Sequence, residues 1–233
     1  METVRLTVPL SCLLAVLSGT FTALAQTADD ARAPSEACIA CRAEVDSIRG
    51  VLSEREWAAV QGGEIVTSKV DSKDADGHKK SLVQSSAILS FPAAEVWSVV
   101  IDFESRPKFV PGAKEVKTIR REGNQLWLQE HLRVFLMNIR FGVINTLEPE
   151  LGRVTWRIDP EAKNDIADTS GSWQIVSLDE QRTLVHYEAR IDSGKPVPGF
   201  IEDFLARRSL PKMISGLRDE VARRFPQLRD AGS

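Results

Sequence analysis

The sequence has few of the residue types that carry most enzyme chemistry and none of the short catalytic motifs. Its 233 residues include three cysteines and three histidines. No nucleophile elbow, His-Glu-x-x-His helix or Gly-rich phosphate loop occurs, so the sequence predicts no metal site and no redox cofactor. The formal net charge of −3 gives no overall attraction to nucleic acid, which is therefore not an expected partner. Acid/base catalysis stays open, because carboxylates can converge in the fold without any sequence signature.

Charged residues are absent from one stretch near the N-terminus. Arg5 precedes the uncharged run Leu6 to Ala25, which ends in Ala23-Leu24-Ala25. A signal peptidase accepts small residues at the first and third of those positions. We therefore expect residues 1–25 to be a signal peptide, cleaved before Gln26, and the mature protein to be periplasmic or secreted. The alternative is an uncleaved membrane anchor, since the run approaches the length of a membrane span.

Cleavage would leave Cys38 and Cys41 as the only cysteines. Two spaced thiols in an oxidising compartment favour a disulfide, which is our expectation for this pair. A redox-active pair, free thiols or metal binding are the alternatives. A thioredoxin-like pair would lie in a βαβ context, which the surrounding sequence does not show, and a structural zinc site would need further ligands.

Residues 26–80 are expected to form an N-terminal appendage with a short helical pair. One helical stretch follows Cys41 and runs to Leu52. The second helix is signalled by a capping box from Ser53 to Glu56, and it ends at Gly62-Gly63. A strand is expected over residues 64–70.

Short strand-like segments dominate the chain from residue 81 to residue 192. Tight turns such as Glu122-Gly123-Asn124 separate them, which is the pattern of an antiparallel meander. Seven strands are predicted, over residues 81–90, 114–121, 125–135, 138–147, 154–158, 172–178 and 183–192.

The apolar period changes after these strands. Between Phe200 and Val221, apolar residues recur every three or four positions, which predicts a long C-terminal helix with one buried face. Pro211 should kink or divide this helix near Leu210. One helix against one curved sheet is an α+β architecture over residues 81–226, followed by a tail at 227–233. A single helix cannot fill the whole concavity of such a sheet, which leaves room for an internal cavity.

The run from Ala87 to Ala113 joins an apolar strand, a Pro-started amphipathic helix and a Phe-rich connection that ends in Val110-Pro111-Gly112. With three later segments, it resembles the START-like superfamily (the helix-grip or birch-pollen-allergen fold), especially the bacterial polyketide cyclase/dehydrase and coenzyme Q-binding branch. The resemblance implies a curved sheet wrapped around a long C-terminal helix, two short helices after the first strand, and a ligand cavity. It covers roughly residues 81 to 225 and rests on the segments FPAAEVWSVVIDFESRPKFVPG, SGSWQI, TLVHYEARI and VPGFIEDFLARRSLPKMISGLRDEVARRF.

Nine aromatic residues are candidates for the wall of such a cavity. Each could equally be an ordinary core residue, because packing and ligand binding both remove apolar surface from water. The candidates are Trp97, Phe103, Phe109, Trp127, Phe141, Trp156, Trp173, Phe200 and Phe204.

His131 is the weak candidate for a catalytic residue, and His186 is a second histidine on a predicted strand. Successive residues of a strand point to opposite faces, so Glu130 and His131 cannot both face the cavity. The face that carries His131 also carries Trp127, whereas the other face carries Leu128 and is plainly apolar. The sequence does not decide which face looks inward, and a solvent-facing or structural role for His131 is the alternative.

Two functional classes follow for the cavity. The first is an exported protein that binds or carries a hydrophobic small molecule, such as a lipid, a quinone or a polyketide-like compound. The second is a cyclase- or dehydratase-like enzyme that uses His131 or an inward carboxylate as acid or base. A third hypothesis places a redox function on Cys38 and Cys41, outside the cavity.

The final helix carries a basic cluster at Arg207, Arg208 and Lys212. The simplest interpretation is a solvated helix face. The alternative is transient contact with a membrane surface, where these side chains and the loop over residues 194–200 would meet anionic lipid head groups.

Overall fold

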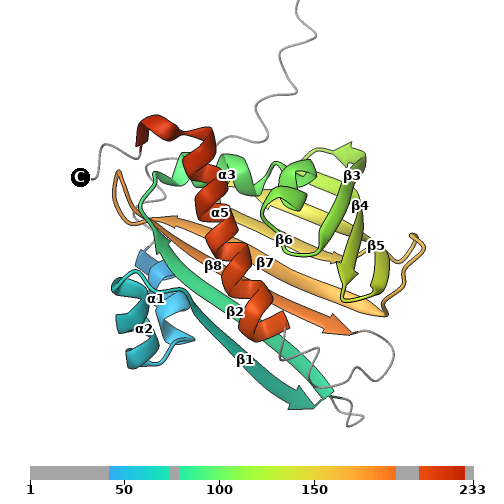
Figure 1. The fold of residues 1–233 in the computed structure, drawn as a ribbon, viewed down its shortest axis with the longest axis horizontal. Helices are drawn as coiled ribbons and strands as arrows, with labels where there is room; N and C mark the ends of the chain where they lie inside the picture. The colour runs from blue at the N-terminus through green and yellow to red at the C-terminus, as the bar shows by residue number, and fades with distance from the viewer. Residues whose placement is uncertain (1–41, 74–78, 193–204, 229–233) are drawn as a thin grey trace, which may run out of the picture.

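The computed structural model describes residues 42–73, 79–192 and 205–228, which form one curved antiparallel sheet and the helices packed against it (Figure 1). The sheet has eight strands in the order β1-β2-β8-β7-β6-β5-β4-β3. Every neighbouring pair is antiparallel. The strands are β1 (Val66–Lys73), β2 (Lys79–Leu89), β3 (Ala113–Glu122), β4 (Gln125–Val134), β5 (Met137–Glu148), β6 (Arg153–Ile158), β7 (Asp168–Ser177) and β8 (Thr183–Asp192).

The α+β helix-grip architecture expected from the sequence is confirmed, and the strand count differs by one. The additional strand is β1, which pairs with β2 from Val66↔Ser86 to Lys73↔Lys79. The sequence predicts this strand only as part of the appendage, because hydrophobic alternation cannot show that a strand joins a particular sheet. Residues 1–41, with the expected signal peptide and Cys38 and Cys41, lie outside the described residues.

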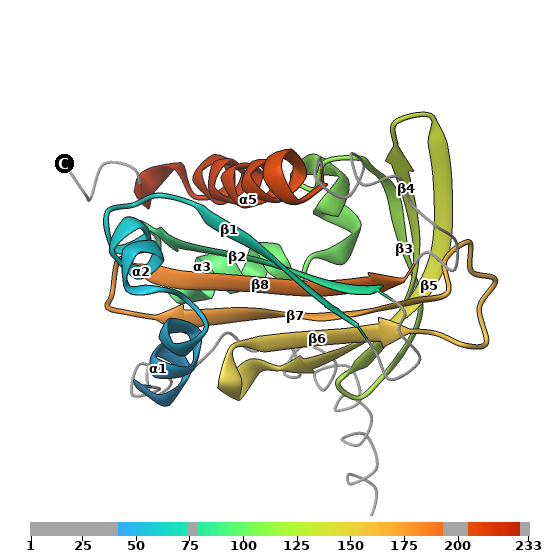
Figure 2. The same ribbon diagram turned by 90° about the horizontal axis from the view of Figure 1, so that it is seen from below.

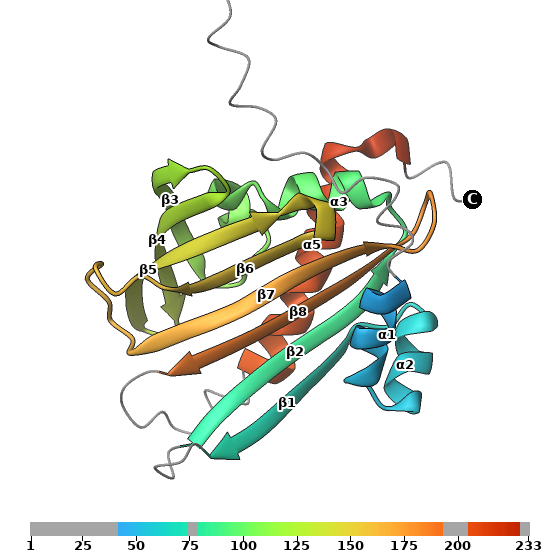
Figure 3. The ribbon, with the colours of Figure 1, turned by 180° about the vertical axis from the view of Figure 1, so that it is seen from behind.

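Both expected N-terminal helices are present, as α1 (Arg42–Gly50) and α2 (Glu54–Gln61). The capping box forms as predicted: the Glu56 amide donates to Ser53 Oγ at 3.3 Å, and the Ser53 amide donates to a Glu56 carboxylate oxygen at 2.8 Å. Ile48 and Val60 pack with Val176 and Leu184 of β7 and β8. The two helices therefore lie on the face of the sheet opposite to the main core, at one end of it, as the view from behind shows (Figure 3).

The main core lies on the concave face. Beyond β2 come α3 (Ala93–Val100) and the 3-10 helix η2 (Phe103–Lys108), which are the two short helices expected after the first strand of the domain. β3, β4 and β5 curl towards the side of the sheet on which α5 (Leu210–Arg224) lies (Figure 2). Residues from α3, α5 and the strands join one buried cluster, whose helical members include Val96, Trp97, Val99, Val100, Met213, Ile214, Leu217 and Val221.

Pro211 marks a change of helix type near Leu210, as the sequence predicts. A π-helical turn, η4 (Leu205–Ser209), precedes α5, and Pro211 lies in the first turn of α5, where no helical hydrogen bond needs its nitrogen. The remaining short helices are η3 (Pro149–Leu151) and η5 (Pro226–Leu228).

A glycine allows α5 to approach the end of η2 closely. A Cβ atom built on Gly216 would lie 2.8 Å from the carbonyl oxygen of Phe109, which is closer than real Cβ contacts. Any larger residue would therefore push α5 away from the segment that follows η2.

An ionic cluster fixes the C-terminal end of α5. The Glu220 side chain is 5% exposed and accepts hydrogen bonds from Arg223 at 2.7 Å and from Arg224 at 2.8 Å. Arg224 also donates to Asp102, just before η2, at 2.7 Å. The hydrogen bonds from Arg223 and Arg224 lower the pKa of Glu220 to about 2, and the bond from Arg223 has the larger effect. These arginines are thus held by carboxylates of the protein itself.

Replacing Glu220 with glutamine should destabilise the protein by about 2 kcal/mol near neutral pH, because the three charge-assisted hydrogen bonds from Arg223 and Arg224 lose their anionic acceptor. The ordinary pKa of 4.5 falls to about 2 in the fold, so the stabilisation is present above pH 4.5 and is lost as the pH falls towards 2. Urea unfolding of wild type and Glu220→Gln at several pH values should show the difference shrinking in this window. Asp219→Asn, an exposed neighbour, is the matched control; a pH-independent difference for Glu220→Gln would contradict the assignment.

Candidate ligand-binding cavity

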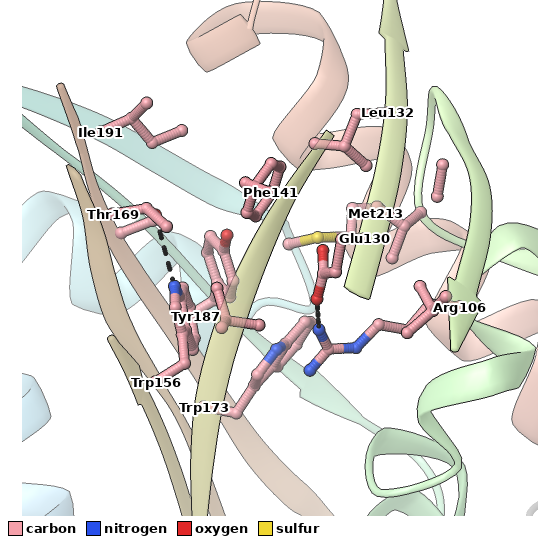
Figure 4. A pocket seen from close by; sticks show the side chains of 15 residues that line it. Arg106, Glu130, Leu132, Phe141, Trp156, Thr169, Trp173, Tyr187, Ile191 and Met213 are labelled. Carbon is pink, nitrogen blue, oxygen red and sulfur yellow. Dashed lines mark hydrogen bonds and ion pairs between the residues drawn. The ribbon is translucent and has the colours of Figure 1, made fainter. Parts of the chain in front are cut away.

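A cavity of about 110 Å³ lies between the concave face of the sheet, the end of η2 and α5. Its wall is mainly aliphatic and aromatic, with a small number of polar side chains that converge from separate elements (Figure 4). This combination is typical of small-molecule sites. The lining residues are Arg106, Val110, Ala113, Val116, Glu130, Leu132, Phe141, Val143, Trp156, Thr169, Trp173, Tyr187, Ala189, Ile191 and Met213.

The register of β4 settles which of its faces looks inward. Glu130 and Leu132 line the cavity, and Leu128 belongs to the core cluster behind them. Because side chains alternate along a strand, Trp127 and His131 point to the opposite face. The plainly apolar face, with Glu130 inserted into it, is therefore the inner one.

A buried ion pair is the main polar feature of the cavity. Nη1 of Arg106, from η2, donates to the Glu130 carboxylate at 2.6 Å, and each side chain is 11% exposed. The guanidinium carbon also lies 4.6 Å from the centroid of the Phe103 ring. Nη2 of Arg106 is buried without a hydrogen-bond partner in the structure. Removing two charges from water is costly, and this cost offsets much of the attraction between Arg106 and Glu130. A role in the function of the cavity therefore explains the pair better than a role in stability.

Tyr187, the single tyrosine of the chain, is the second polar feature. Its ring stacks on Trp156 with centroids 5.5 Å apart and meets Trp173 edge-on at 4.8 Å. Burial raises the pKa of the Tyr187 phenol well above its usual value, and Glu130 adds to the rise while Arg106 opposes it. Tyr187 is consequently a neutral phenol that can donate or accept one hydrogen bond at the cavity wall.

The nine aromatic candidates fall into four groups. Phe141, Trp156 and Trp173 line the cavity. Trp97, Phe103 and Phe109 are buried in the adjoining core and are not among the lining residues. Trp127 lies on the outer face, where the Arg120 guanidinium stacks 3.8 Å from its ring centroid, so the cavity position expected for it is wrong. The last two candidates, Phe200 and Phe204, lie outside the described residues.

The histidines do not face the cavity in the described part of the chain. His131 is on the outer face of β4, with Nε2 3.2 Å from the Asn138 side-chain oxygen, so the expectation of a catalytic role in the cavity is corrected. His186 also points to the outer face, with Nδ1 2.8 Å from Ser86 Oγ. Burial lowers the pKa of His186, which favours the neutral ring. The third histidine, His78, lies outside the described residues.

Two of the polar residues in the cavity were not among the candidates predicted from the sequence. Arg106 lies in a charged segment before Pro107 and carries no signal that distinguishes it from a surface arginine. Tyr187 had a weak signal, because it is the single tyrosine of the chain and lies on a predicted strand. For Glu130 the sequence leaves open whether the side chain faces the cavity. Over residues 42–73, 79–192 and 205–228, no group of three or more His, Cys, Asp or Glu side chains is placed to hold a metal ion.

Removing Arg106 alone should be strongly destabilising, because it leaves the Glu130 carboxylate buried without its partner. We expect Arg106→Met to lower the free energy of unfolding by about 3–5 kcal/mol, and the double variant Arg106→Met/Glu130→Leu to recover most of that loss. Urea unfolding of both variants, of Glu130→Leu and of wild type completes a double-mutant cycle. A loss below about 1 kcal/mol for Arg106→Met would show that the pair is effectively solvated and would contradict its burial.

Comparisons with known proteins agree with this fold. A search of curated proteins finds no match. Among solved structures, the chain is similar to the Zhui aromatase/cyclase from Streptomyces sp. R1128 (20% identity, TM-score 0.55, 66% of this chain and 99% of that chain). A STAR-related lipid transfer protein from Xanthomonas axonopodis is also similar (16% identity, TM-score 0.51, 66% and 98%). So is human STARD10 (14% identity, TM-score 0.55, 78% and 84%).

These identities are too low to indicate more than a shared fold, but a family model matches directly. The model described as "Polyketide cyclase / dehydrase and lipid transport" covers residues 89–218, which is more than half of the chain. The protein therefore belongs to the polyketide cyclase/dehydrase and lipid transport family.

Proposed function

We propose that this protein binds or carries a hydrophobic small molecule with at least one polar group, in the cavity between the sheet and α5. The observation that carries the proposal is a cavity wall of aromatic and aliphatic side chains into which an ion pair and a neutral phenol project. Burial of apolar ligand surface would supply most of the affinity, at roughly 25 cal/mol per Å². The polar residues would fix the orientation of the ligand.

The size of the cavity constrains how a ligand would enter. Its volume of about 110 Å³ is below the roughly 300–1,000 Å³ of typical ligand pockets. A lipid-sized ligand would have to displace side chains of the wall. Met213 on α5 and Ile191 at the end of β8 are suited to yield, because methionine is flexible and Ile191 is exposed at the cavity rim.

An enzymatic role is the second candidate, favoured by the proximity of Glu130, Arg106 and Tyr187 at one cavity. A carboxylate could accept a proton and a neutral phenol could donate one, which are the two transfers that a cyclisation or dehydration needs. The descriptions of the matching family and of the Zhui aromatase/cyclase support this candidate by analogy.

Contact with a membrane is a further part of the proposal. The tip of the β4–β5 hairpin exposes three consecutive apolar residues: Phe135, Leu136 and Met137 are 48%, 85% and 46% exposed. Arg133 and Arg140 are exposed beside it. An apolar tip flanked by basic side chains suits insertion into an anionic lipid interface.

The hairpin tip is continuous with the cavity. Leu132 lines the cavity and lies two residues before Val134, where β4 ends. Its pairing partner on β5 is Ile139, which packs against the main core. A ligand leaving a membrane at the tip could therefore reach Leu132 along the apolar pair of Val134 and Met137. In the described part of the chain, no helix is long and apolar enough to cross a membrane.

We also propose that the protein acts outside the cytoplasm. This rests on the leader-like sequence of residues 1–25 and on Cys38 and Cys41, which would form a disulfide in an oxidising compartment.

Filling the cavity should abolish ligand binding. Val110→Trp places an indole at a partly exposed lining position, and we expect at least a tenfold loss of apolar compounds that copurify from the native envelope, measured by mass spectrometry of lipid extracts. Val51→Trp, at an exposed position between α1 and α2, is the matched control and should keep the wild-type amount. The proposal fails if wild-type protein carries no apolar compound, or if both variants carry as much as wild type.

Charging the hairpin tip should weaken membrane contact. We expect Leu136→Asp to reduce sedimentation with anionic phosphatidylglycerol vesicles by about tenfold, because it removes the most exposed apolar side chain and adds a repelled charge. Ile119→Asp introduces the same charge at an exposed isoleucine on β3 and serves as control. Equal loss in both variants would point to net charge alone, and no loss in either would exclude the tip as the contact.

A further inference from the structure

Asn145 on β5 is a buried amide with no hydrogen-bond partner. Its exposed fraction is 0%, and neither its side-chain oxygen nor its side-chain nitrogen is paired in the structure. Buried polar side chains in folded proteins are nearly always hydrogen-bonded, because an unpaired one loses its water contacts without replacement. An amide with both ends unpaired therefore calls for an explanation.

The sheet register places Asn145 on the cavity face. On its own strand, Val143 is the next residue on the same face, and Val143 lines the cavity. Across the sheet, Asn145 pairs with Trp156 of β6, which also lines the cavity, and with Leu126 of β4. Asn145 thus adjoins two residues of the cavity wall and has no polar neighbour among them.

Trp156 leans away from Asn145. A Cβ atom on Gly171 of β7 would lie 2.4 Å from the Trp156 ring, so the indole is seated over this glycine, on the side of β6 that faces away from β5. Trp156 Nε1 donates to Thr169 Oγ1, also on β7, at 3.4 Å. Trp156 therefore offers Asn145 no hydrogen bond.

The chemistry of the amide indicates what would pair with it. A primary amide offers donors and an acceptor and carries no charge. At the other polar position, Arg106 and Glu130 already neutralise each other. A neutral hydroxyl, which both donates and accepts, matches Asn145 better than a carboxylate, whose charge would be desolvated without a counter-ion.

We propose that Asn145 determines specificity by binding a hydroxyl group of a neutral, hydroxylated apolar ligand at an inner extension of the cavity. This inference rests on the proposed function, since it assigns the ligand class for the same cavity. The extension would open when the ligand displaces Val143, the lining residue next to Asn145 on the same face of β5.

Two probes of nearly equal shape test this inference: 1-naphthol, which has a hydroxyl, and 1-methylnaphthalene, which has a methyl group in its place. Calorimetric titration of wild-type protein should show about tenfold tighter binding of 1-naphthol, the range expected for one buried hydrogen-bonding group. Asn145→Leu and Asn145→Val should erase this preference and leave the affinity for 1-methylnaphthalene within about twofold of wild type.

Matched variants separate binding from folding. Asn145→Thr differs from Asn145→Val by one hydroxyl in place of a methyl group, and it should retain part of the preference. Asn138→Leu changes an exposed asparagine of the same strand and should bind both probes as wild type does. Both apolar variants should also raise the melting temperature of the free protein, because they remove an unpaired amide; this second readout does not depend on any ligand.

The outcomes distinguish the inference from the proposed function. If neither probe binds wild type, the proposed function is wrong and the inference falls with it. If both probes bind wild type equally, the cavity binds apolar molecules but Asn145 does not recognise a hydroxyl. If the preference persists in Asn145→Leu and Asn145→Val, the hydroxyl is recognised elsewhere, and Glu130 and Tyr187 become its candidates.

Discussion

The contact between α5 and the concave face of the sheet is the interaction on which the other features depend. An antiparallel sheet that curls on one side presents a broad apolar surface, and this surface has to be covered if the domain is to fold. Met213, Ile214, Leu217 and Val221 cover one part of it, and α3 covers another. Gly216 permits the close approach to Phe109, and the Glu220 cluster ties the C-terminal end of α5 to Asp102.

Two short helices and one long one cannot cover a curved eight-stranded sheet completely. The remaining space lies beyond Phe109, where η2 ends and the strands β3 to β5 curl away from the rest of the sheet. Three polar side chains project into this space: Arg106 from η2, Glu130 from β4 and Tyr187 from β8. Since water is largely excluded there, each of these groups interacts more strongly with its neighbours than it would at the surface. Most hydrogen-bonding capacity of the cavity wall therefore lies in the polar atoms of these three side chains.

The elements of the fold were largely predictable, because they depend on periodicity and on local signals. The capping box at Ser53, the period of three and four residues up to Val221 and the position of Pro211 all correspond to structure. That β1 joins the sheet could not be predicted, since pairing is a long-range property that leaves the strand's own pattern unchanged.

The cavity was less predictable, for a reason that β4 illustrates. Trp127 and His131 share one face and Leu128 and Glu130 the other, and the pattern does not show which face is inner until the neighbouring strands fix the curvature. The aromatic residues of α3 and η2 were expected in the wall because aromatic content cannot separate a core position from a lining one. Phe103 fills the core, whereas Arg106, three residues later, reaches the cavity.

The position of β1 has a consequence for where this protein can be divided. β1 pairs along β2 and covers the backbone hydrogen-bonding groups that β2 would otherwise present at the edge of the sheet. The family match begins at residue 89, the last residue of β2. A fragment cut to the limits of the match would lack β1 and all of β2 before that residue and would leave β8 as an unprotected edge, open to pairing with another molecule. The limits of the family match therefore differ from those of the complete sheet.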